Sequence, residues 1–123
     1  MLLHTSEENY LKAIFVLQKK YSVVRAIDVA QYLQFSKPSV SNALKKLQSN
    51  GYLEKDGANH LSLTPKGQAY AERIYEKYSY FHQALLAAGV NPAVAEQEAC
   101  SMEHVLSDVS FQKLKKQYPK WCF

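Results

Sequence analysis

The sequence predicts a mainly α-helical fold that contains one small β-hairpin. Three observations predict it. Apolar residues recur at three-to-four spacing in several segments of the 123 residues, as they do on the buried face of a helix. Between residues 27 and 50, a short and a longer amphipathic segment lie on either side of a tight turn. Directly after them, two short alternating segments flank an Asp-Gly dipeptide, which is typical of a hairpin.

The composition excludes several classes of protein. Hydrophobic residues make up 47% and charged residues 21% of the chain, values typical of a folded protein rather than a disordered one. The longest apolar run, from Ala84 to Val90, is far shorter than the roughly 18 residues of a membrane span, and no secretory signal is visible. The only cysteines, Cys100 and Cys122, argue against a disulfide framework. We therefore expect a cytoplasmic protein with no membrane contact.

The first third of the chain predicts two helices. Ser6 is placed to cap a helix over residues 7–20, because its side chain can accept a hydrogen bond from a free backbone N–H. The β-branched segment 21–25 predicts a connection or a minimal strand. A short helix is expected over residues 27–33, with Ile27, Ala30 and Leu33 on one side.

The next helix, over residues 37–50, has clear signals at both ends. Pro38 lies in its first turn, where proline is tolerated, and Gly51 suits a left-handed cap at its end. The hairpin follows, with strands predicted over residues 52–55 and 60–63.

The rest of the chain predicts three more helices. Thr64 and Pro65 form a strong helix start, with threonine as the cap. The predicted ranges are 65–88, 91–106 and 107–117. We therefore divide the chain into residues 1–66, with three helices and the hairpin, and residues 67–123, which are helical.

Residues 27–63 have the element order of a winged helix-turn-helix. At about 100° per residue, Val40, Leu44 and Leu47 fall on the core side of the longer helix. Its other side is small, polar and basic and carries no acid, so it can approach the major groove closely. Most amphipathic helices have a polar outer face, but the neighbouring elements favour DNA binding. The residues predicted to contact DNA are Arg25, Ser36, Lys37, Pro38, Ser39, Ser41, Asn42, Lys45, Lys46, Lys55 and His60.

The positive charge lies in the front half of the chain. The formal net charge is +4, and residues 1–66 hold nine Lys or Arg and five acids, whereas residues 67–123 hold six of each. A solvated basic face would explain so small an excess, but its position suits contact with DNA phosphates. Within the basic half, the amide of Asn42 suits the edge of an adenine.

A second group of residues predicts a metal site in the back half. Between residues 77 and 113 there is no Lys or Arg, so the acids there lack a cation nearby in sequence. The predicted helix over 91–106 carries four candidate ligands on one face: Glu96, Cys100, Glu103 and His104. A thiol, carboxylates and an imidazole together suit a transition-metal ion. On the preceding helix, Tyr78 and His82 are also neighbours one turn apart.

The same residues have simpler interpretations. Cys100 can be a small hydrophobic residue of the core. The glutamates can form a solvated surface stripe, and His82 can be a solvent-exposed residue. A catalytic pair of Cys100 and His104 is disfavoured, because nearby acids oppose formation of a thiolate and no oxyanion site is evident. We therefore expect no enzyme and no small-molecule substrate.

Four stretches of the chain carry a resemblance to a known family: Ser6–Ile14, Phe35–Ser41, Leu61–Gly67 and Glu98–Asp108. The last contains Cys-x-x-Glu-His and is the most specific. On these residues the chain resembles the metal-dependent transcriptional regulators of the diphtheria toxin repressor and manganese transport regulator family. The resemblance implies a homodimer, joined through its C-terminal helices, that binds a palindromic operator in double-stranded DNA when loaded with a divalent metal ion.

The resemblance also implies which residues bind the ion. The principal site of iron-type members corresponds here to Asn9, Cys100, Glu103 and His104. At the second site, His82 and Glu96 remain as good ligands, whereas Tyr78 stands where members carry a His. Cysteine ligation favours Fe(II), with Mn(II), Zn(II) or Co(II) as alternatives.

The leading prediction is a metal-dependent DNA-binding regulator, a repressor of metal-homeostasis genes. One ion joining Asn9 to the ligands of the back half would set the spacing of two recognition helices on DNA. An alternative is a winged-helix regulator that has lost its metal response. In that case Lys12, which stands where manganese-type members carry Glu, replaces the ion near Glu103. A third hypothesis is an enzyme or metal-binding module unrelated to DNA, which would show no affinity for duplex DNA at low salt.

Overall fold

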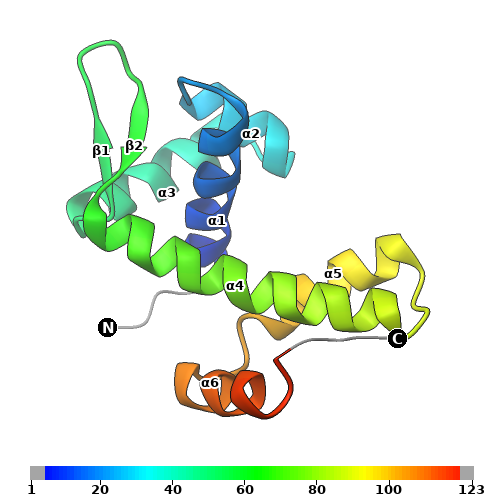
Figure 1. Cartoon of the computed structure of the whole chain (residues 1–123). Coiled ribbons are helices and arrows are strands. Elements are labelled where there is room, and N and C mark those ends of the chain that lie inside the picture. Colours follow the sequence, from blue (N-terminus) through cyan, green and yellow to red (C-terminus); the bar gives the residue numbers. More distant parts are fainter. Residues whose placement is uncertain (1–4, 120–123) are drawn as a thin grey trace. The chain divides into compact units, whose positions relative to one another are not determined.

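The structure, a computed structural model, describes residues 5–119, so that Cys122 lies outside the described residues. The chain divides into two compact units, Met1–Glu72 and Arg73–Phe123. One helix, α4 (Pro65–Ala87), begins in the first unit and ends in the second (Figure 1). The predicted fold class, mainly helical with one two-stranded hairpin, is confirmed. Among the described residues, no helix is long and apolar enough to cross a membrane.

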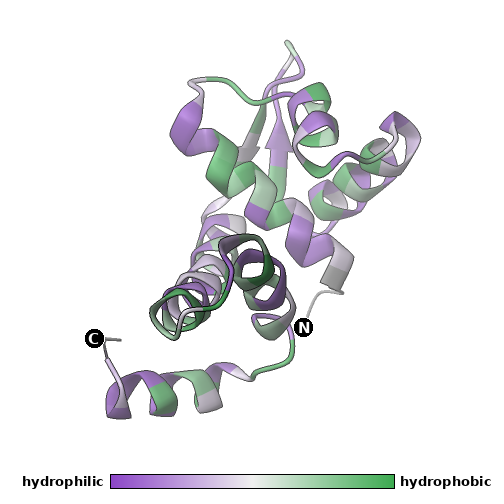
Figure 2. Ribbon diagram, turned by 90° about the vertical axis from the view of Figure 1, so that its right-hand side faces the viewer, coloured by the Kyte–Doolittle hydropathy of each residue, from purple (hydrophilic) through white to green (hydrophobic). Residues whose placement is uncertain are grey.

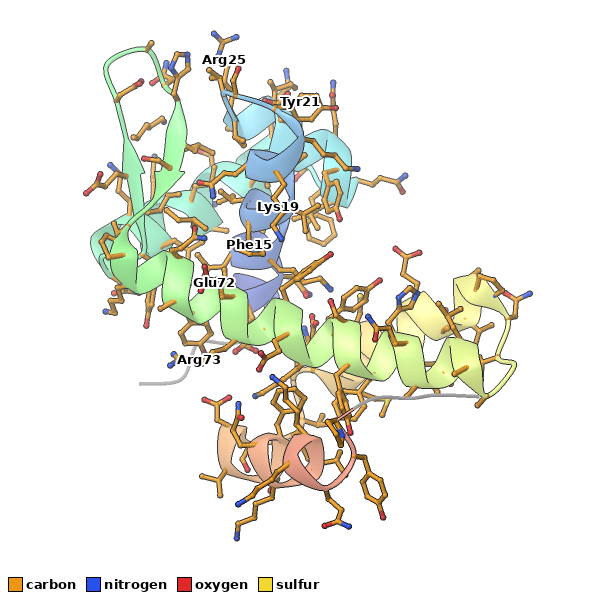
Figure 3. All side chains as sticks on the ribbon, viewed as in Figure 1. Phe15, Lys19, Tyr21, Arg25, Glu72 and Arg73 are labelled. Atoms are coloured by element: carbon orange, nitrogen blue, oxygen red, sulfur yellow. The ribbon has the colours of Figure 1, made fainter. Side chains whose placement is uncertain are left out.

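The first unit is built on α1 (Thr5–Lys20). Its apolar side, with Leu11 fully buried, contributes to the core that α2, α3 and the hairpin share. The prediction that Ser6 caps this helix is wrong, because the helix already includes that residue. Near the other end, the Lys19 Nζ lies 4.4 Å from the centre of the Phe15 ring (Figure 3), so the lysine side chain extends along an aromatic face.

A tight turn joins α2 (Ala26–Leu33) to α3 (Lys37–Ser49). Gln34 has a left-handed backbone, with φ of 59°, a conformation that is uncommon outside glycine and asparagine. The Phe35 N–H donates to the Ala30 carbonyl at 3.1 Å, which closes the end of α2. The two helices therefore meet at a sharp angle without a glycine between them.

The ends of α3 agree with the predicted Pro38 and Gly51 signals, and Ser36 adds a cap that was not predicted. The Ser36 Oγ accepts a hydrogen bond from the Ser39 N–H, and Pro38 lies in the first turn. At the other end Gly51 has a φ of +81°, which glycine adopts without steric cost. The buried residues of α3 are Val40, Leu44 and Leu47. Figure 2 shows that the apolar residues of this unit gather where its elements face one another.

The hairpin consists of the antiparallel strands β1 (Leu53–Lys55) and β2 (Leu61–Leu63), each one residue shorter than predicted. Val24 forms an isolated bridge with Leu61, and the Leu61 N–H donates to the Val24 carbonyl at 2.7 Å. The segment before α2 therefore acts as a minimal strand beside the hairpin.

Asp56 closes the loop between the two strands. Its Oδ1 accepts hydrogen bonds from the Ala58 and His60 N–H groups, each at 2.9 Å. The Asp-Gly dipeptide lies in this loop, but the left-handed backbone belongs to Asn59, with φ of 63°, and not to Gly57. Asparagine tolerates this conformation better than most residues.

The start of α4 lies against the segment that follows α3. The Gly67 N–H donates to the Thr64 Oγ1 at 3.1 Å, so Thr64 caps the helix, and its hydroxyl donates to the Gly51 carbonyl at 2.6 Å. A Cβ atom at Gly67 would lie 2.0 Å from the Tyr52 carbonyl oxygen. This close approach of two backbone segments requires glycine.

The second unit contains the later part of α4 with α5 (Pro92–Met102) and α6 (Asp108–Gln117). Its core is a cluster of buried and largely aromatic residues: Tyr80, Phe81, Ala99 and Phe111. The Ser107 Oγ accepts a hydrogen bond from the Ser110 N–H at 3.1 Å and caps α6, close to where a helix was predicted to begin. α5 ends four residues earlier than predicted.

Candidate nucleic-acid interface and metal centre

The outer face of α3 is formed by small, polar and basic side chains. Its buried residues fix the rotation of the helix, so the residues between them are directed away from the core. All the predicted DNA contacts on this helix are exposed: Lys37, Pro38, Ser39, Ser41, Asn42, Lys45 and Lys46. The first turn of α3 carries no acid. Such a face can approach DNA closely and offer hydroxyls, an amide and ammonium groups.

Ser36 and Ser39 also build the start of α3. The Ser36 Oγ lies 3.3 Å from the Ser39 N–H that donates to it, and the two hydroxyl oxygens are 2.9 Å apart. Ser36 therefore stabilises the helix as its cap. Its hydroxyl is already oriented by this contact.

A hollow of about 350 Å³ lies between the starts of α2 and α3, lined by Ala26, Ile27, Lys37, Val40 and Ser41. Ile27, which is 40% exposed, contributes an apolar side chain to this surface. Its apolar side chain at helical spacing is typical of a core residue. Sequence reasoning therefore missed Ala26 and Ile27 as parts of this surface.

Besides the cap residue Ser36, three predicted contacts lie outside α3, and the structure brings two of them together. Lys55 is exposed on β1. Arg25 precedes α2, and its side chain lies at the same end of the unit as the hairpin loop (Figure 3). Its Nη2 lies 3.3 Å from the Nε2 of His60, whose Nδ1 lies 3.1 Å from the Oδ2 of Asp56. Hydrogen bonds from the backbone N–H groups of His60 and Ala58 lower the pKa of the Asp56 carboxyl below its ordinary value of 3.8.

Glu103 and His104 form the centre of the candidate metal site. The His104 Nε2 lies 3.2 Å from the Glu103 Oε1, and these side chains are 6% and 0% exposed. Carboxylates and imidazoles that are withdrawn from water in this way need a partner or a metal ion. Cys100 is half-buried, whereas Glu96 is exposed.

The continuous helical stripe predicted from Glu96 to His104 does not form. α5 ends at Met102, and the His104 N–H bonds to the carbonyl of Ser101, three residues earlier, at 3.3 Å. This tighter turn changes the direction of the last side chains. Within residues 5–119, no three His, Cys, Asp or Glu side chains lie close enough to hold an ion. The structure thus pairs Glu103 with His104 and does not gather Cys100 or Glu96 into one group with them.

The remaining predicted ligands lie on other helices. The His82 ring stacks on the Tyr78 ring one turn earlier in α4, with centres 5.2 Å apart and planes 13° from parallel. His82 is half-buried. Asn9 is half-buried in α1 of the first unit.

Lys77 is a buried cation that sequence reasoning missed. Its Nζ lies 2.7 Å from the Asp108 Oδ1 and donates to the Leu106 carbonyl at 2.9 Å. These contacts tie the segment after His104 to α4. The stretch between residues 77 and 113 contains no Lys or Arg, and the cation that pairs with Asp108 comes from α4. Tertiary packing supplies the partner, and no local pattern could have indicated it.

Two family models match the chain in succession. "Iron dependent repressor, N-terminal DNA binding domain" matches residues 2–61, and "Iron dependent repressor, metal binding and dimerisation domain" matches residues 64–120.

Individual proteins are similar over most of the chain. The transcriptional regulator MntR of Salmonella typhimurium is 32% identical over 100 residues, which cover 81% of this chain and 64% of that protein. An HTH-type transcriptional regulator of Methanocaldococcus jannaschii is 31% identical over 112 residues, which cover 89% of this chain and 90% of that protein. The solved structure of the manganese regulator SloR matches with a TM-score of 0.79 at 33% identity, covering 94% of this chain and 55% of that chain. The chain thus spans less than two thirds of MntR and of SloR.

Proposed function

Because the chain belongs to the family of iron-dependent repressors, we propose that it is a metal-dependent DNA-binding transcriptional regulator that represses metal-homeostasis genes. The observation that carries the proposal is the order of the matched regions, a DNA-binding one followed by a metal-binding and dimerisation one. We assign DNA binding to residues 1–66, and metal binding and dimerisation to residues 67–123. We expect the protein to act in the cytoplasm, in contact with genomic DNA.

We propose α3 as the recognition helix that enters the major groove. Its exposed hydroxyls and the Asn42 amide can bond to base edges, and Lys45 and Lys46 can neutralise phosphates. Asn42 is the residue that we assign to an adenine edge. The other proposed contacts are Arg25, Ser36, Lys37, Pro38, Ser39, Ser41, Lys55 and His60.

For the metal site we propose Cys100, Glu103 and His104, with Asn9 as a further ligand. A thiolate, a carboxylate and an imidazole suit Fe(II) best among the candidate ions, with Mn(II), Zn(II) and Co(II) as alternatives. Glu103 and His104 are already paired at 3.2 Å and withdrawn from water. Cys100 has to join them when they bind an ion. A bound divalent ion supplies the positive charge that compensates the buried carboxylate and the thiolate.

Asn9 lies in the first unit, whereas the other three ligands lie in the second. Once they share an ion, these residues select one arrangement of the units from those already populated. In a homodimer, that selection fixes the spacing of two recognition helices to the half-sites of a palindromic operator. Val105 and Val109 of the second unit, 83% and 67% exposed, support a dimer surface there. A second metal site is proposed at His82 and Glu96.

The proposal predicts that tight DNA binding depends on the ion. A labelled duplex, enriched from a random-sequence pool by the wild-type protein with Mn(II), is titrated with protein in Fe(II), in Mn(II) and in chelator. We expect metal to strengthen binding by tenfold or more, within the roughly 5- to 150-fold of allosteric couplings. His104→Ala should lose this increase, because it removes a ligand.

The matched control is Glu98→Gln, since Glu98 is exposed on α5 and outside the proposed ligand set. It should respond to metal like the wild type. Equal affinity with and without metal, in the wild type and in His104→Ala alike, would reject the metal switch.

One observation favours a second function, a winged-helix regulator that binds DNA without metal. No three ligand side chains are gathered in the described part of the chain. This function requires tight DNA binding in chelator. Restoration of metal dependence by Lys12→Glu would support it, and an unchanged response would count against it.

A further inference from the structure

Arg25, His60 and Asp56 form a chain of side-chain contacts beside the hairpin loop. The Arg25 Nη2 lies 3.3 Å from the His60 Nε2, and the His60 Nδ1 lies 3.1 Å from the Asp56 Oδ2. The backbone explains why they meet. Val24 pairs with Leu61 in an antiparallel bridge, so the residues next to that pair, Arg25 and His60, come to face each other.

The chain of hydrogen bonds has one direction. A guanidinium has only donors, so the His60 Nε2 must accept and the imidazole proton must lie on Nδ1. That N–H donates to Asp56. The Oδ1 of Asp56 already accepts from the Ala58 and His60 N–H groups, which leaves Oδ2 for the imidazole. The guanidinium therefore donates to the imidazole, and the imidazole donates to the carboxylate.

We propose that Asp56 and His60 are positioning residues that hold the Arg25 guanidinium ready for a DNA phosphate. The backbone N–H of Arg25 donates to the Asp28 Oδ2 at 2.9 Å, so contacts fix both the backbone and the guanidinium of this exposed residue. An arginine that is already ordered loses less conformational entropy on binding. The contact with His60 uses one of the five N–H donors of the Arg25 guanidinium, so the other donors can bind a phosphate. The inference rests on the DNA binding proposed above.

The alternative is that Asp56 only shapes the loop, while its charge repels DNA. The variant Asp56→Asn separates the two explanations, because it retains an oxygen acceptor for the Ala58 and His60 N–H groups and removes the charge. Loss of repulsion alone would strengthen DNA binding.

The positioning role predicts the opposite sign. In Asp56→Asn the side-chain NH₂ faces the His60 Nδ1, which must then accept, so the imidazole proton moves to Nε2. There it meets the donors of the Arg25 guanidinium. The guanidinium is released, and DNA binding becomes weaker.

The test uses the full chain with Mn(II) and a labelled mixed-sequence duplex over a range of salt concentrations. Arg25→Ala should weaken binding about tenfold, as expected for a charged hydrogen bond, and reduce the salt slope by about one. Asp56→Asn should weaken binding about threefold, within the cost of ordering one long side chain. In the Arg25→Ala background, Asp56→Asn should cause no further loss.

A His60 variant completes the design. His60→Ala should weaken DNA binding at least as much as Asp56→Asn, because it removes the acceptor of the Arg25 guanidinium. Thermal unfolding of every variant verifies that the loss of affinity does not reflect loss of the fold.

Two results would overturn the positioning role and leave the proposed function intact. One is an Asp56→Asn variant that binds as tightly as the wild type or more tightly. The other is an equal loss from Asp56→Asn with and without Arg25. Failure of the wild type to bind the duplex even at low salt would overturn the proposed function and this inference together.

Discussion

At the scale of single residues, Gly67 connects two elements that are separate in sequence. A Cβ atom there would lie 2.0 Å from the Tyr52 carbonyl oxygen and 2.9 Å from its carbon. Both are backbone atoms, so neither can rotate away as a side chain would. The start of α4 would have to move, although the Thr64 hydroxyl bonds to the Gly51 carbonyl beside it. Tertiary contact, and not helix propensity, requires glycine at this position.

We predict that Gly67→Ala destabilises the protein by roughly 1–3 kcal/mol, as overpacking does. In an open helix the same change would stabilise by roughly 0.5–1 kcal/mol. The free energy of unfolding in urea, followed by circular dichroism, measures the effect.

The matched control is Gly57→Ala in the hairpin loop, where a Cβ would meet nothing within 4 Å. Its effect should stay within about 0.5 kcal/mol. A Gly67→Ala variant as stable as the wild type would show that α4 can shift without cost.

At the scale of elements, the segment between α5 and α6 depends on α4. α5 ends at Met102, and the tighter turn after it carries the paired side chains of Glu103 and His104. Lys77 of α4 then holds this segment through the Leu106 carbonyl. Glu103 and His104 therefore lie in a turn that a neighbouring helix fixes, whereas Glu96 and Cys100 lie on α5.

We predict that Lys77→Met destabilises the second unit by roughly 1–3 kcal/mol, because the Leu106 carbonyl loses its donor. The Asp108 carboxylate, which is half-exposed, loses its ion pair as well. Urea denaturation followed by near-ultraviolet circular dichroism of the aromatic core measures the change.

Lys115→Met provides the comparison, since the Lys115 Nζ pairs with Glu76 at 2.8 Å while both side chains are at least 40% exposed. Exposed pairs of this kind contribute about 0–1 kcal/mol. Equal losses of stability in the two variants would mean that the burial of Lys77 makes no extra contribution to the free energy of unfolding.

At the scale of the whole molecule, the positive charge is distributed unevenly along the chain. The excess of four positive charges lies within residues 1–66, and residues 67–123 are balanced. The face of α3 and the side chains of Arg25 and Lys55 are exposed in the first unit. The buried Glu103–His104 pair lies in the second unit.

We predict that the affinity for duplex DNA falls steeply with salt. Neutralisation of about four phosphates would reduce it roughly a hundredfold between about 50 and 200 mM salt. Fluorescence anisotropy with a labelled duplex at constant Mn(II) measures the slope. No binding at the lowest salt would instead favour an enzyme or a metal-binding module unrelated to DNA.

Local sequence signals predicted most of the fold. The Thr64 cap, the left-handed Gly51 and the helix start at Ser107 were readable because each depends on a few adjacent residues. Two errors at helix ends have a different cause. Ser6 is typical of a cap but lies within α1, and α5 ends early because its last turn tightens.

The candidate sites were predicted less completely. The polar face of α3 follows from a helical repeat, so its exposure was predictable. The pairing of Arg25 with His60 depends on the bridge between Val24 and Leu61. Asp56 is only four residues from His60, but Arg25 and His60 are far apart in sequence, and periodicity cannot detect their contact.

The sequence alone thus determined the order of the elements, the winged helix-turn-helix and the residue types suited to DNA and metal, because repeat spacing and capping are local properties. Only the tertiary structure decided that Gly67 must be glycine, that Lys77 holds the turn after His104, and that Asp56 reaches Arg25 through His60. Each of these depends on distances between segments that are brought together only when the chain folds.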